Sequence, residues 1–215
     1  MTTDPADLIG AAQREVATRI HDGREARAVI ATRTYPTDPA DLWDALTNPE
    51  RLPRWFLPIS GDLRLGGRYQ FQGNAGGTIT ACEPPRRVAV TWEFGGGVTW
   101  LEVTLTAEGS GTRLRLEHLA HVDPRWGQFG PGAVGIGWDL GLMGLTRHLA
   151  SGGAAVDPAA VMAWTVSAEG KAFIRTSSEG WSQAAVVAGD DPREAHAAAA
   201  RTTAFYLGEP DPTAG

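Results

Sequence analysis

The sequence predicts an α+β fold in which a curved antiparallel sheet wraps around a long helix. Three observations indicate this class. Residues 33–92 pass from a short strand through a helix start and a Trp-Phe pair into alternating strands separated by glycines. The connections between these strands are short and rich in glycine or proline, which favours antiparallel hairpins. Residues 133–150 then carry one long helical pattern. A sheet and a helix in this order can enclose a hollow for a small molecule.

Size and composition exclude several classes of protein. The 215 residues, of which 42% are hydrophobic, suit one domain with helical additions. The net charge of −6 and the scattered arginines argue against nucleic acid and against a polybasic membrane contact. Cys82 is the single cysteine, so an internal disulfide is excluded. A signal peptide and an apolar span of about 20 residues are both absent from the sequence, and a cytoplasmic location is expected.

Residues 1–26 are predicted to form an N-terminal helix over positions 4–21. Asp4 can cap it and Pro5 would occupy its first turn. Apolar residues recur every four positions and would form one stripe, namely Leu8, Ala12, Val16 and Ile20. His21-Asp22-Gly23 is interpreted as the end of this helix.

Residues 27–150 are predicted to form the main domain. A strand over 27–35 is followed by a helix that Asp38-Pro39 begins and by a short helical turn over 50–55. Six strands are then expected, over 60–65, 67–72, 77–82, 87–94, 98–106 and 112–118. Their alternation places one set of side chains inward: Tyr69, Phe71, Val88, Val90, Trp92, Phe94, Leu101, Val103, Leu105, Leu114, Leu116 and His118.

After a loop over 121–132, a long helix over 133–150 is expected to close the domain. Gly137, Gly141 and Gly144 share one of its faces. Each glycine costs helix stability, about 1 kcal/mol relative to alanine, so close approach of another backbone is the expected compensation.

Residues 151–215 are predicted to be a helical extension packed on the main domain. Helices begin at Asp157-Pro158, at Ser167 and at Asp191-Pro192, and the last ends at Gly208. Five aromatic residues of this extension are expected to be buried, namely Trp164, Phe173, Trp181, Phe205 and Tyr206. They would form either a lid over the hollow or the interface of a homodimer.

Four segments resemble one superfamily. DLWDALTNPERLPRWF, GDLRLGGRYQF, TWEF and GTRLRLEH, together with the long helix, resemble the START-like (SRPBCC) superfamily. Within it the chain is most similar to bacterial homologues of the C-terminal domain of the heat-shock-protein ATPase activator. The resemblance covers about residues 27–150 and implies a helix-grip fold. Its members include lipid and hormone binders, aromatic polyketide cyclases and dehydratases, and co-chaperone domains, so the fold alone does not assign a function.

His118 is the candidate catalytic residue. It shares the inward parity of Leu114 and Leu116, and a buried imidazole can act as a general base or bind a ligand carbonyl. The alternative is a core histidine satisfied by a backbone carbonyl or by Asp139. A metal site made of His118, His121 and Asp139 is not predicted, because a His-x-x-His pair leaving a strand does not place both rings on one face. No metal and no cofactor is therefore expected, and the G-x-G-x-x-G of residues 130–135 lacks the preceding parallel strand of a dinucleotide site.

A set of mainly aromatic residues is predicted to line the hollow. Flat rings suit an aromatic or polycyclic ligand, and an arginine at the mouth could hold a carboxylate or enolate oxygen. The predicted ligand-binding residues are Trp55, Phe56, Arg64, Tyr69, Phe71, Trp92, His118, Trp126, Trp138 and Leu142. For any single ring, a place in an ordinary large core is the alternative.

Three functions follow from these residues and from the resemblance. The first is binding of a small hydrophobic or aromatic molecule between the sheet and the long helix. The second is a cyclase or dehydratase reaction in the same hollow, with His118 as base aided by Arg64 or Tyr69. The third is a protein-interaction role like that of the co-chaperone. Apolar walls with one or two polar anchors would favour the first, and several converging polar groups the second.

Overall fold

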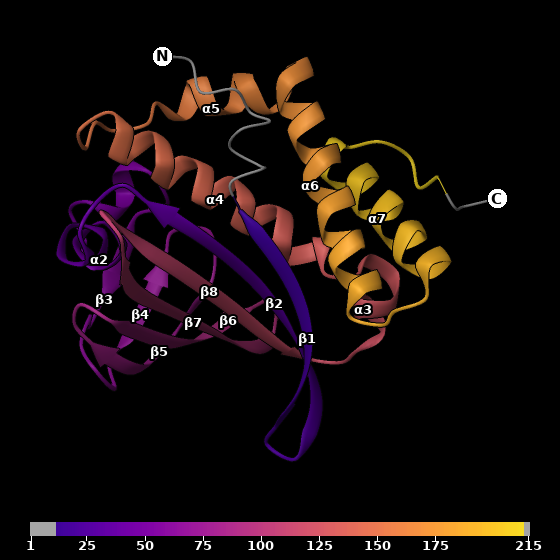
Figure 1. Cartoon of the computed structure of the whole chain (residues 1–215), viewed down its shortest axis with the longest axis horizontal. Coiled ribbons are helices and arrows are strands. Elements are labelled where there is room, and N and C mark those ends of the chain that lie inside the picture. The colour runs from indigo at the N-terminus through magenta and orange to yellow at the C-terminus, as the bar shows by residue number, and fades with distance from the viewer. Residues whose placement is uncertain (1–11, 213–215) are drawn as a thin grey trace. The chain divides into compact units, whose positions relative to one another are not determined.

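The computed structural model describes residues 12–212 (Figure 1). This part of the chain divides into two compact units. We call residues 32–120 and 144–156 the sheet unit, because most strands belong to it. Residues 12–31, 121–143 and 157–212 form the helical unit. The chain passes between the units four times, within strand β2, at the end of β8, within helix α4 and just before α5.

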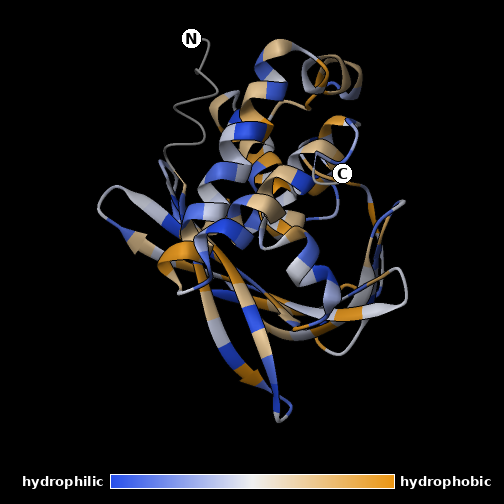
Figure 2. Cartoon of the chain, turned by 90° about the vertical axis from the view of Figure 1, so that its right-hand side faces the viewer, coloured by the Kyte–Doolittle hydropathy of each residue, from blue (hydrophilic) through white to orange (hydrophobic). Residues whose placement is uncertain are grey.

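Eight strands form one sheet in the order β1-β2-β8-β7-β6-β5-β4-β3. They span Gln13–His21, Arg24–Tyr35, Ile59–Gly61, Arg68–Phe71, Gly76–Glu83, Arg87–Phe94, Gly97–Glu108 and Gly111–His121. Each pair of successive strands from β3 to β8 is antiparallel. Hydrophilic and hydrophobic segments alternate along the strands in Figure 2, as the sequence pattern requires. With the long helix α4 (Gly132–Ala150), this sheet confirms the α+β helix-grip class.

The predicted helix starts after the main strand and in the extension are confirmed. They are α2 (Pro39–Thr47), α5 (Pro158–Thr165), α6 (Ala168–Val187) and α7 (Pro192–Leu207). The Asp38 side chain accepts hydrogen bonds from the backbone N–H groups of Ala40 and Asp41, which satisfies two donors that a helix start leaves unpaired. Asp191 caps α7 in the same way. The predicted short turn after α2 is the 3₁₀ helix η1 (Leu52–Arg54).

The predicted N-terminal helix is wrong from residue 13 onward, and its first positions lie outside the described residues. Gln13–His21 is strand β1, next to β2 in the sheet. Asp22 and Gly23 both have positive φ, 49° and 72°, which is the turn geometry that Asp-Gly favours in two-residue hairpins. The four-residue spacing does not distinguish a helix from a strand, because Val16 and Ile20 also share one face of a strand. Ile20 is 73% exposed, so the predicted apolar stripe is not buried there.

Three smaller expectations are also wrong. Strand β3 ends at Gly61 because the chain turns over residues 62–67, where the Arg64 N–H donates to the Asp62 carbonyl and the Gly67 N–H donates to the Arg64 carbonyl. The predicted loop over 121–132 contains a short helix, α3 (Pro124–Phe129), which Asp123 caps. Phe94, expected inward, is 62% exposed because it ends β6 at a glycine turn.

Two of the five aromatic residues of the extension, Phe173 and Trp181, are buried within the helical unit, and Trp164 and Tyr206 are half-buried. Phe173 packs with Met143 of α4 and with the half-buried Trp164, and Trp181 is fully buried. Helices α6 and α7 lie side by side (Figure 1). The expected burial of Phe205 is wrong, since its side chain is 73% exposed on α7, where it lies beside the rings of Phe129 and Tyr206. Among the helices that the structure describes, none combines the length and the apolar character needed to cross a membrane.

Two glycines of α4 are expected to respond in opposite directions to alanine. A Cβ atom at Gly144 would lie 2.7 Å from the backbone oxygen of Trp55, so the predicted close approach of a backbone is confirmed there. A Cβ atom at Gly137 would lie 3.5 Å from the Tyr206 hydroxyl, an ordinary contact. We expect Gly144→Ala to destabilise the protein by about 1–3 kcal/mol, because the overlap exceeds the gain in helix propensity.

Gly137→Ala should instead stabilise the protein by up to about 1 kcal/mol, since only helix propensity changes. Urea unfolding of both variants measures the difference. A Gly144→Ala protein as stable as the Gly137→Ala protein would contradict the observed packing.

Candidate functional site

The inner face of the sheet unit carries a row of side chains placed by the strand register. Val90 of β6 lies opposite Ile79 of β5 and opposite Leu101 of β7, and Leu101 lies opposite His118 of β8. Residues directly opposite one another point to the same face of a sheet. The predicted inward parity of His118 is therefore confirmed, and His118 is 4% exposed.

Aromatic rings continue this face without interruption to the segment after α2. Ring centroids are 5.6 Å apart for Trp55 and Phe56, 5.2 Å for Phe56 and Phe71, 5.7 Å for Phe71 and Trp92, and 6.0 Å for Trp92 and His118. These separations are typical of favourable ring pairs. We call these five residues the aromatic row. All five belong to the predicted ligand-binding set, and the structure brings them together in the sheet unit.

Part of this inner face is only half-buried. Val88, Val90 and Trp92 of β6 keep accessible surface, although β6 is a central strand of the sheet. On the neighbouring strands the inward residues Val103 and Leu116 are 8% and 4% exposed. The inward apolar side chains of β6 are therefore less completely covered than Val103 and Leu116, and Leu101 of β7 is half-buried as well.

His118 makes a hydrogen bond whose direction can be assigned. Its Nε2 lies 2.8 Å from the Thr99 hydroxyl oxygen, and the Thr99 hydroxyl lies 3.1 Å from the carbonyl oxygen of Trp92. A hydroxyl has one proton, which Thr99 donates to that carbonyl, so Nε2–H of His118 is the donor to Thr99. Burial lowers the pKa of His118 from 6.5 to about 4, because a charged imidazole would lose its hydration. The imidazole is neutral at physiological pH.

Tyr69 and Arg64, the predicted helpers of His118, are engaged elsewhere. The Tyr69 hydroxyl donates to the carbonyl oxygen of Thr91 at 2.7 Å, and burial raises the pKa of its phenol. Tyr69 also packs against Phe71. The Arg64 side chain is 77% exposed and donates to Asp62 at 2.8 Å.

Polar contacts around Arg51 join the segment that carries Trp55 to α2 and to the end of α4. The Nε–H of Arg51 donates to Nε2 of His148 at 3.1 Å, and Nη1 donates to Asp41 Oδ1 at 2.7 Å. Because the guanidinium can only donate, His148 must carry its proton on Nδ1, which donates to the Ala154 carbonyl at 2.9 Å. The hydrogen bond from Arg51 lowers the pKa of Asp41. The indole N–H of Trp55 donates to the Ala45 carbonyl.

Three predicted ligand-binding residues belong to the helical unit. The ring of Trp126 lies under the Arg27 guanidinium, with 5.1 Å between Cζ and the ring centroid, and Arg27 binds both carboxylate oxygens of Asp190. Leu142 of α4 is buried and Trp138 is half-buried. They lie on α3 and on the first turns of α4, which belong to the helical unit, whereas His118 belongs to the sheet unit, and their part in a ligand site stays a prediction.

Asp139, expected as an alternative partner of His118, is the centre of a buried network in the helical unit. Its Oδ2 accepts from Arg14 Nε at 3.0 Å, from the Ser177 hydroxyl at 2.5 Å and from the Trp181 indole N–H at 3.0 Å. The residues come from β1, α4 and α6. The network stabilises the helical unit and has no evident role in the aromatic row.

The chain is similar to known proteins over most of its length. The model of the family described as Activator of Hsp90 ATPase homolog 1-like protein matches residues 36–150. A crystal structure of CalU16 from Micromonospora echinospora is 31% identical, with a TM-score of 0.65, and the match covers 81% of this chain and 98% of that one. A solution structure of the same protein is 30% identical, with a TM-score of 0.69 and coverages of 83% and 97%.

The match to CalU16 covers a larger share of the chain than residues 36–150 occupy, so the likeness includes part of the sequence outside the family model. MLL2253 from Mesorhizobium loti, at 24% identity, shares the fold, with a TM-score of 0.53 and coverages of 58% and 98%. No curated protein matches the chain. The strand register, the long helix and these similarities agree, and the chain belongs to the START-like family of Activator of Hsp90 ATPase homolog 1-like proteins.

Proposed function

We propose that this protein binds a small, largely apolar aromatic molecule against the inner face of its sheet unit. The observation that carries the proposal is the aromatic row, an unbroken series of ring contacts from Trp55 to His118 beside half-buried apolar side chains of β6. Apolar surface that a fold leaves partly uncovered on a concave face is a common feature of ligand sites. A flat ligand would cover it and stack on these rings.

The polar chemistry of this face suits a binding protein better than a base-catalysed enzyme. The predicted helpers do not support a reaction, since the Tyr69 hydroxyl is bound to a backbone carbonyl and Arg64 is exposed. A general base works best when its pKa lies near the operating pH. At about 4, the pKa of His118 makes its imidazole a weak base at neutral pH. The His118–Thr99 pair is better suited to orient a polar edge of the ligand.

The test is a titration of the protein with N-phenylnaphthylamine, an uncharged aromatic probe whose fluorescence rises in apolar surroundings. We expect Trp92→Ala to weaken binding at least about tenfold, because removing a large aromatic contact costs more than about 1.4 kcal/mol. Trp100→Ala is the matched control. Trp100 lies on the adjacent strand β7 and is half-buried, like Trp92. Its side chain points to the outer face of the sheet, where it is paired with Leu119 of β8.

Trp100→Ala should change the affinity less than about twofold, a change within the range of a neutral surface substitution. Leu101→Trp would fill the inner face and should abolish binding while the protein stays folded by circular dichroism. Equal effects of the two Trp→Ala substitutions, or undisturbed binding to the Leu101→Trp variant, would refute the proposed site.

A further inference from the structure

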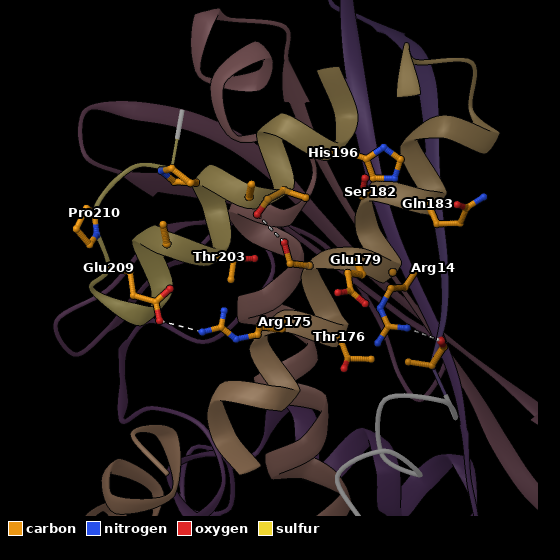
Figure 3. Close-up of a pocket in the computed structure, with 17 residues that line it drawn as sticks. Arg14, Arg175, Thr176, Glu179, Ser182, Gln183, His196, Thr203, Glu209 and Pro210 are labelled. Atoms are coloured by element: carbon orange, nitrogen blue, oxygen red, sulfur yellow. Dashed lines mark hydrogen bonds and ion pairs between the residues drawn. The ribbon is translucent and has the colours of Figure 1, made fainter. Parts of the chain in front are cut away.

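The helical unit contains a groove between α6 and α7 that shares no residue with the aromatic row (Figure 3). Its volume is about 950 Å³. Small residues of the two helices, among them Gly180, Ala199 and Ala200, form part of its walls. Figure 3 shows polar side chains from both helices along the same groove, with Ser182 and Glu179 on α6 and His196 on α7.

One buried polar group on this groove lacks a partner. Ser182 is 3% exposed, and its hydroxyl oxygen has no hydrogen-bond partner among residues 12–212. Buried hydroxyls are nearly always paired, because an unpaired one loses its hydration without compensation. A ligand in the groove that can donate to this hydroxyl would supply the missing hydrogen bond.

The charges on the groove leave one carboxylate unmatched. Arg175 is paired with Glu209 at 2.9 Å, and Arg14 is paired with Asp139 at 3.0 Å. Glu179 forms no ion pair within the described part of the chain. It precedes Ser182 by three residues on α6, a spacing that places both side chains on one face of a helix. The groove thus presents a carboxylate beside an unpaired hydroxyl.

We propose that this groove binds a small amphipathic amine. The ammonium group pairs with Glu179 and donates a hydrogen bond to the Ser182 hydroxyl, and the hydrocarbon part lies along the alanine and glycine wall. A carboxylate ligand gains no such contact, because both guanidinium groups on the groove already have acidic partners and Glu179 repels it.

The test compares hexylamine with hexanol and hexanoate, which share its chain length but differ in charge. Nuclear magnetic resonance titrations of the full chain should show hexylamine shifting the amides of Gly180, Ser182 and Ala199, with the other two compounds at least about tenfold weaker. Glu179→Gln should weaken hexylamine about fivefold, the size of a surface ion pair. Ser182→Ala should weaken it about tenfold, the size of a hydrogen bond to a charged group.

Two control variants establish whether the amine binds in this groove. Glu169→Gln removes the same charge from α6 away from the groove and should leave hexylamine affinity unchanged. Trp92→Ala in the sheet unit should also leave it unchanged. Hexanoate binding as tightly as hexylamine would overturn the proposal. So would equal losses in Glu179→Gln and Glu169→Gln, or a loss caused by Trp92→Ala.

Discussion

Asp139→Ala is expected to destabilise the helical unit by about 3–5 kcal/mol, the usual cost of removing one partner of a buried ion pair. Asp139 is 3% exposed, and the side chain of Arg14 that it binds is 10% exposed. Without the carboxylate, the Nε–H of Arg14, the Ser177 hydroxyl and the Trp181 indole N–H all lose their acceptor. Calorimetry of the full chain measures the loss.

Graded substitutions test whether the carboxylate is the centre of this network. Ser177→Ala and Trp181→Phe each remove one neutral donor and should cost about 1–2 kcal/mol apiece. Asp123→Asn, which changes an exposed cap of α3, should cost less than about 1 kcal/mol. If Asp139→Ala cost no more than Asp123→Asn, the network would not stabilise the unit as described.

His118 is expected to make the protein about 3 kcal/mol less stable near pH 4 than near pH 7. Its pKa is about 4 in the folded protein, against 6.5 in an unfolded chain. Between these values the unfolded chain binds a proton that the folded chain excludes, so stability falls as the pH falls. Above pH 6.5 both states are neutral and the stabilisation is complete; a gap of 2.5 units corresponds to about 3 kcal/mol.

The pH dependence of His118 is isolated by comparison with His118→Gln. The contributions of the carboxyl groups to the pH dependence are the same in both proteins and cancel in the difference. The imidazole of His118 contributes in the wild type alone. The free energy of unfolding of the wild type relative to this variant should therefore fall by about 3 kcal/mol on acidification. A difference independent of pH would mean that His118 is accessible to protons in the folded state.

Local signals predicted most of the fold. The Asp-Pro pairs at residues 38–39, 157–158 and 191–192 begin helices as expected, because the aspartate caps and the proline fits the first turn. The same signal stands at Asp123-Pro124, where α3 begins within the segment predicted to be a loop. Gln13–His21 is a strand although its spacing predicts a helix, because apolar residues four positions apart fit both periods, and the Asp22-Gly23 turn is the signal that distinguishes them.

The sequence predicted those parts of the candidate site for which the alternation of side chains along a strand is sufficient to assign the face. Period two placed Trp92 and His118 on the inner face, and the register agrees. The sequence does not identify Thr99 as the partner of His118, because the contact joins two strands. Its direction depends on the Thr99 hydroxyl donating its proton to the Trp92 carbonyl. Trp126 follows His118 closely in the sequence but belongs to the helical unit, because closeness in sequence carries no information on the unit to which a residue belongs.

The most direct test of the binding proposal is to locate a bound aromatic probe on the protein. Intermolecular nuclear Overhauser effects can be recorded between N-phenylnaphthylamine and the methyl groups of the isotope-labelled full chain. The proposal predicts contacts to Val90 and Leu101 on the inner face and none to Leu119 on the outer face. Contacts to Leu119 without contacts to Val90 or Leu101 would contradict it.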